Sequence, residues 1–333
     1  MAEYWLDSTG SRGATLSISR EKFESLKTCR LRLAALLDVE QLFSSIALST
    51  FEFEKFLLLC PLEEFFGRFP GRTIGDVHRR MDDISTRVNI LMLTLFSAIR
   101  AYHDQRRSLL PTAGIPDGIC DQIELKFART FDDFFDYRLM EALRNYTQHN
   151  RLPVQQFSIG SRRDYGEVVS DRKTSKSRTD VVFYLVKNDI LEHRKKLRSA
   201  TMSELENIEE EKLELTLILR NYVSLLSLGH FELRRLTENI LTDAEELLDI
   251  TRQEFSRCIP NSVEELPEHL SAKASVSGQL EEHYLDIVLV DKLRGYRASW
   301  TGLSRLWEHY ISSAVVPDRE LYFSERKSQL SID

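Results

Sequence analysis

The sequence predicts a mostly α-helical protein. Its 333 residues contain only 13 glycines and 8 prolines, which suits long helices better than a β architecture with many turns. Apolar residues also recur at three-, four- and seven-residue intervals over long stretches, as they do on one face of a helix. Hydrophobic residues make up 42% of the chain and charged residues 29%, so a soluble globular protein with a sizeable core is expected.

Two long helices are expected in the first half of the chain. The first runs from Thr73 to about Gln105, and one face of it carries Val77, Ile84, Val88, Leu91, Leu95, Ile99 and Tyr102. The second is capped by Asp117, and its buried side carries Ile123, Phe127, Phe131, Phe134, Phe135, Leu139 and Leu143. It is expected to end at His149, because Asn150 suits the residue after a helix and Pro153 cannot continue one.

The first 60 residues contain shorter patterns, which predict a strand and two helices. Residues 14–18 alternate as in a short strand, and residues 21–37 favour a helix. The segment Asp38–Gln41 resembles a capping box, which predicts the start of a further helix. That helix should reach about Leu59, where Pro61 stops or restarts it.

A β-hairpin is expected after the second long helix. Leu152 to Ile159 and Asp180 to Val186 alternate apolar and polar residues, with many β-branched and aromatic types. They flank a polar segment, Ser161 to Arg178, which we expect to be a long loop. The chain thus divides into an N-terminal helical domain (1–153), a hairpin with a basic loop (154–186) and a C-terminal helical region (187–333).

The C-terminal region is expected to consist of additional long helices. Residues 202–255 favour one or two helices, with an acidic first turn and a break at Leu228–Gly229. Residues 276–311 are expected to form a final amphipathic helix.

Charge, cysteine content and missing motifs exclude several classes. The formal net charge of −7 argues against a protein that coats nucleic acid non-specifically, although a local basic site remains possible. The four cysteines are far apart in sequence, which indicates neither a zinc ribbon nor a disulfide framework and favours a reducing cytoplasm. We expect no secretory signal and no membrane span. Walker, GxGxxG, HExxH and GxSxG motifs are absent, and we expect neither a cofactor nor a metal.

The segment Arg144-Asn145-Tyr146-Thr147-Gln148-His149 carries the strongest chemical signal. An arginine can hold a phosphate with two hydrogen bonds, and a histidine can move a proton near neutral pH. Metal-free cleavage of RNA by its own 2′-hydroxyl needs both functions. Residues five apart on an ideal helix point about 140° away from each other. The two side chains therefore converge only if the helix frays at its end or if a partner's site meets them.

The two long helices, the second ending in Arg-Asn-x-x-x-His, resemble the core of the HEPN superfamily. This resemblance covers about Thr73 to Pro153 and includes a polar strip on the first helix, Asn89, Ser97, Arg100 and Asp104. It implies a HEPN-like helical bundle that pairs into a homodimer and cleaves RNA without a metal, leaving a cyclic phosphate. It also implies a role in bacterial toxin or antiphage systems, with a cognate antitoxin or defence-system subunit as a further partner. A tyrosine two residues after the histidine, which the family's adenylylated toxins carry, is replaced here by Arg151.

The resemblance assigns roles to individual residues. Arg144 would bind the scissile phosphate, His149 would act as general base or acid, and Asn145 would orient one of them or contact the ribose. Arg100 and Asp104 either order His149 or form a structural ion pair. The basic segment adds candidate RNA-binding residues, which are Arg162, Arg163, Arg172, Lys173, Lys176 and Arg178.

Other interpretations remain open. Positive residues at the end of a helix are favoured simply because they complement its exposed carbonyl groups, and charged loops are commonly just solvated. The main alternative is a non-catalytic helical scaffold or regulatory subunit that binds RNA or protein. A nucleotide-binding partner of a nucleotidyltransferase is a third possibility. A second Arg-His match, Arg72 to His78, follows a turn-like stretch and lacks the helix-terminal context.

Overall fold

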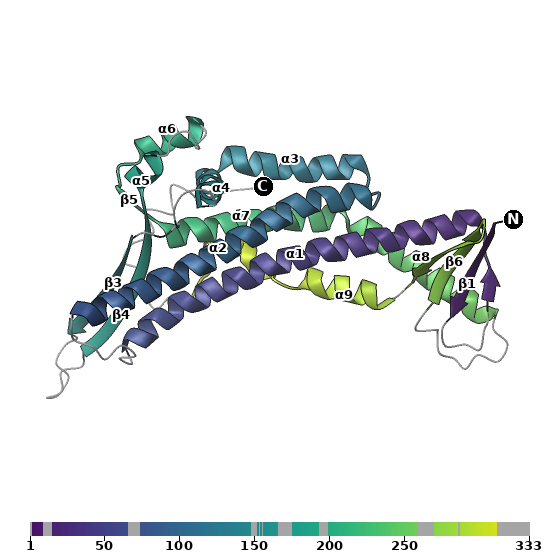
Figure 1. The fold of residues 1–333 in the computed structure, drawn as a ribbon, viewed down its shortest axis with the longest axis horizontal. Helices are drawn as coiled ribbons and strands as arrows, with labels where there is room; N and C mark the ends of the chain where they lie inside the picture. Colours follow the sequence, from purple (N-terminus) through teal and green to yellow (C-terminus); the bar gives the residue numbers. More distant parts are fainter. Residues whose placement is uncertain are drawn as a thin grey trace. The chain divides into compact units, whose positions relative to one another are not determined.

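The computed structural model describes residues 2–8, 15–65, 74–147, 152, 154, 156–165, 175–192, 199–258, 270–285 and 287–311. These residues are mostly helical and include two small antiparallel sheets (Figure 1). The mostly α-helical class expected from the sequence is confirmed.

The chain forms two compact units from interleaved segments. The first unit comprises residues 1–50, 93–141 and 220–306, and the second comprises residues 51–92, 142–219 and 307–333. Four helices contribute residues to both units, namely α1 (Arg20–Phe65), α2 (Ile74–Thr112), α4 (Phe135–Thr147) and α7 (Leu215–Leu236). Helix α2 confirms the long helix expected from Thr73.

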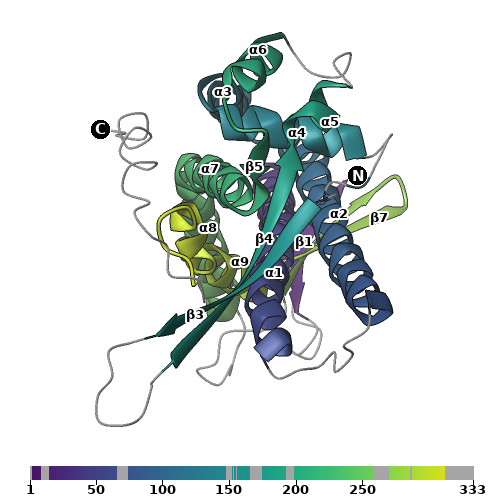
Figure 2. The same ribbon diagram turned by 90° about the vertical axis from the view of Figure 1, so that its left-hand side faces the viewer.

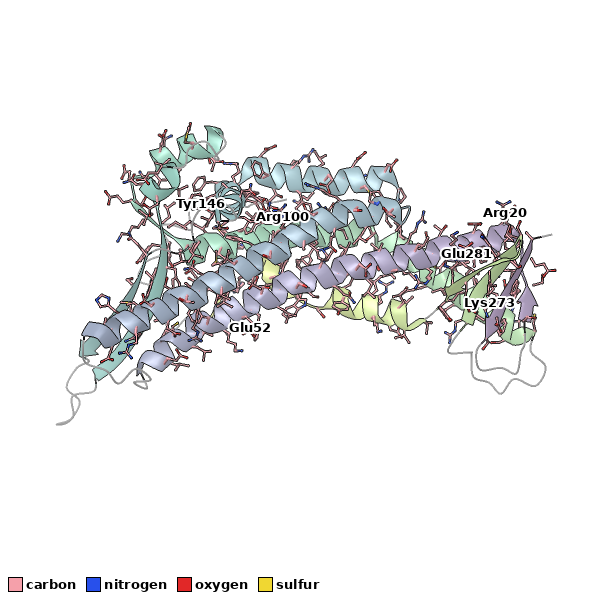
Figure 3. The ribbon with its side chains drawn as sticks, in the orientation of Figure 1. Arg20, Glu52, Arg100, Tyr146, Lys273 and Glu281 are labelled. Atoms are coloured by element: carbon pink, nitrogen blue, oxygen red, sulfur yellow. The ribbon has the colours of Figure 1, made fainter. Side chains whose placement is uncertain are left out.

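A four-stranded antiparallel sheet belongs to the first unit. Its order is β2-β1-β6-β7, and the strands are β1 (Glu3–Ser8), β2 (Thr15–Ser17), β6 (Leu270–Val276) and β7 (Gln279–Tyr284). Lys27 on α1 forms an ion pair with Glu281 on β7 at 2.6 Å, and Lys273 on β6 pairs with Asp7 on β1 at 2.6 Å. Figure 3 labels Glu281 and Lys273 on this sheet. The short strand expected at residues 14–18 is confirmed as β2.

The hairpin of β6 and β7 corrects the helix expected at residues 276–311. Ser277 and Gly278 both have positive φ angles, 53° and 82°, and connect strands that pair at Val276 and Gln279. A two-residue turn of this kind matches the twist of an antiparallel pair and requires the left-handed backbone that glycine adopts freely. The helix that follows, α9, covers only Ile287–Ala298, and a 3-10 turn, η2, covers Thr301–Arg305.

Helix α1 is continuous through the expected helix start at Asp38–Gln41 and through Pro61, which corrects both predictions. Buried apolar residues lie on both sides of that start, including Leu36, Val39 and Phe43. Tertiary burial therefore holds one long helix where local capping signals predict an interruption.

The second long helix is interrupted, contrary to expectation. Phe134 is extended, with φ −118° and ψ 118°, and separates α3 (Asp117–Asp133) from α4. The buried Arg138 guanidinium donates to the carbonyl oxygens of Phe131, at 3.0 Å, and of Asp132. These carbonyls lie in the last turn of α3, so Arg138 satisfies acceptors at the helix end and stabilises the break.

The expected break at Leu228–Gly229 is wrong, because α7 runs through Gly229 to Leu236. A Cβ atom at Gly229 would lie 2.6 Å from the ring of Phe127 on α3, so the glycine allows the two helices to approach closely. The chain turns at Thr237 and continues as α8 (Glu238–Arg257).

A three-stranded antiparallel sheet belongs to the second unit. Its order is β3-β4-β5, and the strands are β3 (Gln156–Tyr165), β4 (Ser175–Val186) and β5 (Lys212–Glu214). The buried Phe183 ring lies 6.2 Å from Phe56 on α1 and 5.7 Å from Phe157 on β3. Two short helices, α5 (Lys187–Leu191) and α6 (Ser199–Asn207), also belong to this unit.

This sheet confirms the predicted hairpin, but it corrects the length of the expected loop and part of the helix expected after the hairpin. β3 and β4 form a long two-stranded ribbon (Figure 2), whose pairs include Arg162 with Arg178 and Asp164 with Lys176. Much of the expected loop is therefore strand. Residues 209–211, expected within a helix, precede β5, which pairs with the end of β4 and draws them out of helical conformation.

Among the described helices, α2 alone is long and apolar enough to cross a membrane. A single such helix is weak evidence for a membrane protein, since the core helix of a soluble protein has the same length and composition.

Candidate functional site

The Arg144 motif occupies the last described turn of α4. Arg144 is half-buried, Asn145 is exposed and Tyr146 is buried, with 7% of its surface accessible. The hydroxyl of Thr147 donates to the carbonyl oxygen of Arg144 at 2.9 Å, which satisfies a carbonyl near the helix end. His149 lies outside the described residues.

The chain that follows the motif is attached to α2 within the second unit. The Asn89 side chain donates from Nδ2 to the carbonyl oxygen of Val154 at 2.9 Å, and Val154 N–H donates to Asn89 Oδ1 at 2.8 Å. Nδ2 also donates to the carbonyl oxygen of Ser85 at 2.8 Å. Asn89 and Val154 are 2% and 1% exposed, so these bonds are shielded from water.

Arg100 and Asp104 are exposed on α2 and pair with each other. Arg100 Nε lies 3.3 Å from Asp104 Oδ2, one helical turn away, and the side chains are 56% and 62% exposed. Both belong to the first unit, whereas Arg144 belongs to the second. Their proposed role in ordering His149 stays a prediction.

The candidate RNA-binding residues are divided between strand and undescribed chain. Arg162 and Arg163 lie on β3, and Lys176 and Arg178 lie on β4. Arg172 and Lys173 lie outside the described residues. The register places Arg162 opposite Arg178, which brings two basic positions together on one ribbon.

A buried polar network in the first unit was not predicted from the sequence. Glu40 on α1, and His230 and Arg234 on α7, are 1%, 0% and 8% exposed. Glu40 falls in an apolar stripe of α1 between Leu36 and Phe43, one turn from each. A carboxylate at such a position is the sequence signal that would have revealed the network, because buried charges require partners.

The hydrogen bonds of this network define one proton arrangement. His230 Nε2 lies 3.1 Å from Glu40 Oε2, and His230 Nδ1 lies 3.0 Å from the Tyr102 hydroxyl. A carboxylate only accepts hydrogen bonds, so Nε2 carries the proton of the neutral imidazole and Nδ1 accepts the Tyr102 O–H. The Phe43 ring stacks on the imidazole at 3.9 Å.

The electrostatics of the network follow from its burial. Burial alone raises the pKa of Glu40, but the hydrogen bond from His230 and the adjacent Arg234 outweigh it and hold that pKa at about 2. Burial lowers the pKa of His230 to about 4, against the opposing effect of Glu40. Burial likewise raises the pKa of Tyr102. At neutral pH the carboxylate is therefore charged, the imidazole is neutral and the phenol is protonated.

Arg234 connects this network to the end of α9. Its guanidinium donates to Glu40 Oε2 at 2.7 Å and to the carbonyl oxygens of Tyr296, Arg297 and Ser299 at 3.1, 2.9 and 3.4 Å. These carbonyls belong to the last turn of α9 and the residue beyond it, where a cation is favoured. Although Glu40, His230 and Tyr102 form a chain that could relay a proton, all three are closed to solvent, so the arrangement is structural.

Within the part of the chain that the structure describes, no group of three or more His, Cys, Asp or Glu residues is placed to hold a metal ion. Comparisons with protein-family models, curated proteins and solved structures found no match to this chain.

Proposed function

We propose that this chain is a HEPN-like, metal-independent endoribonuclease with Arg144, Asn145 and His149 as its catalytic residues. One observation carries the proposal: Arg144 and Asn145 occupy the last described turn of α4, and His149 follows that turn two residues after Thr147 in sequence. Buried Tyr146 fixes the turn that holds the arginine, while exposed Asn145 remains accessible. We further propose a cytoplasmic homodimer that acts in a bacterial toxin or antiphage system with a cognate antitoxin or defence-system subunit.

The proposed reaction is transfer of the phosphoryl group to the neighbouring 2′-hydroxyl. His149 of one protomer removes the proton of the 2′-hydroxyl as its oxygen attacks phosphorus. The bond from phosphorus to the 5′-oxygen breaks, and that oxygen takes a proton from the His149 of the second protomer. Arg144 donates to the non-bridging phosphate oxygens, whose negative charge it stabilises. The products are a 2′,3′-cyclic phosphate and a 5′-hydroxyl.

The ribbon of β3 and β4 is proposed as the RNA-binding arm. Beyond the three residues that pair with β5, β4 has β3 as its neighbour, and this stretch carries Lys176 and Arg178 opposite Asp164 and Arg162. Basic residues on such an arm attract phosphates irrespective of base sequence, and the attraction weakens with salt. The overall negative charge restricts this attraction to local sites.

Incubation of the purified chain with 5′-labelled RNA in EDTA tests the proposal. We expect cleavage that leaves a cyclic phosphate and that fails on RNA with 2′-O-methyl groups. Arg144→Ala and His149→Ala should each lower the rate by roughly 10²-fold or more, since general acid–base catalysis contributes about 10²–10⁴-fold. The matched controls are Arg79→Ala and His78→Ala, because both residues are exposed on α2.

The outcome also separates the alternatives. Cleavage that persists in Arg144→Ala or His149→Ala protein refutes the catalytic assignment. RNA that binds and stays intact with the unmodified chain supports instead a scaffold or regulatory subunit.

A further inference from the structure

Asn89 gives the chain after the Arg144 motif a partner that resembles a strand edge. A side-chain amide has one carbonyl oxygen and one NH2 group in a plane, as a peptide group has an acceptor and a donor. Asn89 uses both on the same residue, accepting from Val154 N–H at 2.8 Å and donating to Val154 O at 2.9 Å. We name this pair of bonds the Asn89 clamp.

The orientation of the Asn89 amide is fixed by three of its hydrogen bonds. Ser85 O and Val154 O are acceptors, so both must face the NH2 group, and Val154 N–H must face the oxygen. Exchanging the two ends of the amide would set acceptor against acceptor and donor against donor. Among the uncharged side chains, only an amide meets this requirement, and a shorter or apolar residue leaves the buried Val154 peptide groups without their bonds.

From this geometry we propose that Asn89 is a positioning residue for the proposed ribonuclease, holding the chain that leaves the Arg144 motif against α2. This inference rests on the proposed function. Val154 follows Thr147, the last described residue of α4, by seven positions, and His149 lies between them in sequence. The motif segment is thus attached to α4 on one side and to α2 on the other.

The Asn89 clamp contributes a fixed backbone orientation at Val154, and its effect on the length of chain between the fixed ends is small. Without the clamp, the next strand-paired residue in the described part of the chain is Gln156, nine positions after Thr147, which pairs with Tyr184. Lengthening a tether from seven to nine residues changes the probability of closure by less than about two-fold. Two bonds to one residue, made to the peptide groups on either side of its Cα, in contrast fix both the position and the orientation of the Val154 backbone. Misplacement of a catalytic group by about 1 Å can lower a rate by about 10²-fold.

The test compares the full-length chain with Asn89→Ala and Asn89→Asp in RNA cleavage and in amide hydrogen exchange. We expect Asn89→Ala to lower kcat by about ten-fold or more and to change KM by less than about three-fold, since Arg144 still binds phosphate. The Val154 amide should exchange at least about ten-fold faster, because its acceptor is lost. Lys187→Met is the control, since it removes a bond to Ile208 O elsewhere in the same unit.

Asn89→Asp gives a signature that a folding defect alone does not produce. A carboxylate would face the carbonyl oxygens of Val154 and Ser85, whereas a protonated carboxyl group can donate to one of them and still accept from Val154 N–H. The cleavage rate of Asn89→Asp relative to the unmodified chain should therefore rise as the pH falls.

Each outcome bears on one of the two proposals. Absence of cleavage by the unmodified chain refutes the ribonuclease and with it the positioning role, while amide exchange still tests the clamp. Unchanged exchange at Val154 in Asn89→Ala overturns the clamp. Faster exchange with a loss in kcat of less than two-fold, or a rate ratio for Asn89→Asp that does not change with pH, overturns the positioning role.

Discussion

Replacement of Glu40 by Gln should remove the charge that balances the buried Arg234. The two residues are 1% and 8% exposed, and the carboxylate accepts from Arg234 Nε at 3.0 Å and from its Nη2 at 2.7 Å. Glutamine keeps the shape of the side chain, but its NH2 group replaces one carboxylate oxygen. This NH2 group would face an N–H group of His230 or Arg234, so that two donors meet. Arg234 then stays buried without a counter-charge.

The magnitude follows from the structure by two routes. A pKa held at about 2 instead of 4.5 corresponds to about 3 kcal/mol in favour of the charged carboxylate. Breaking a buried ion pair by removing one partner costs about 3–5 kcal/mol. We therefore expect Glu40→Gln to lower the free energy of unfolding by about 3 kcal/mol, a large part of the roughly 5–15 kcal/mol that stabilises a typical protein.

Urea unfolding at pH 7, followed by circular dichroism, measures this difference. Glu246→Gln on the exposed face of α8 is the control, with an expected effect of about 0.5 kcal/mol or less. The double variant Glu40→Gln/Arg234→Gln should lose less free energy of unfolding than the two single variants lose together. We expect the difference to be about 1–3 kcal/mol, because the double variant has no unbalanced cation. A loss below about 1 kcal/mol in Glu40→Gln would refute the reasoning.

Further predictions concern pH and packing. Because the folded chain holds the pKa of His230 at about 4 against 6.5 in the unfolded chain, stability present above pH 6.5 should fall by up to about 3 kcal/mol as the pH drops toward 4; urea midpoints of His230→Gln should lack this component. The depressed pKa of Glu40 should remove further stability as the pH falls from 4.5 toward 2. Gly229→Ala should cost about 1–3 kcal/mol despite alanine's better helix propensity, because its Cβ would meet Phe127 at 2.6 Å. Gly295→Ala on α9, where no atom lies within 4 Å of the new Cβ, should be neutral or stabilising by about 0.5–1 kcal/mol in the same assay.

Two results would contradict these predictions. Equal pH dependence of unfolding in His230→Gln and in the unmodified chain would show that the imidazole gains its proton at the same pH in both states. Equal stability of Gly229→Ala and Gly295→Ala would show that α3 and α7 do not approach as closely at Phe127 as the geometry states.

Periodicity predicted the helices well where one face is apolar over many turns, as in α2. It failed where a tertiary contact decides the backbone. Arg138 stabilises a break in the long helix expected from Asp117, and Phe127 requires a glycine inside a helix where glycine otherwise indicates a break. The strand β7 was missed because Leu280 and Tyr284, four residues apart, also fit a helical pattern.

For the candidate site, the sequence supplied residue types and their order. It predicted Arg144 near a helix end, and the structure places this residue in the last described turn of α4. It included Asn89 in a polar strip, but the two bonds that Asn89 makes with Val154 join residues 65 positions apart. No local pattern reveals such a pairing.

The sequence by itself determined that the chain is mostly helical, where α2 lies and that a hairpin follows α4. These features depend on the spacing of apolar residues and on turn residues that are close together in the chain. Tertiary structure alone decided that α1 continues past Asp38, that Glu40 meets His230 and Arg234, and that β5 joins the hairpin. The physical reason is that a buried charge or an unpaired strand edge must find its partner in space. That partner can lie almost 200 residues away, as His230 does from Glu40.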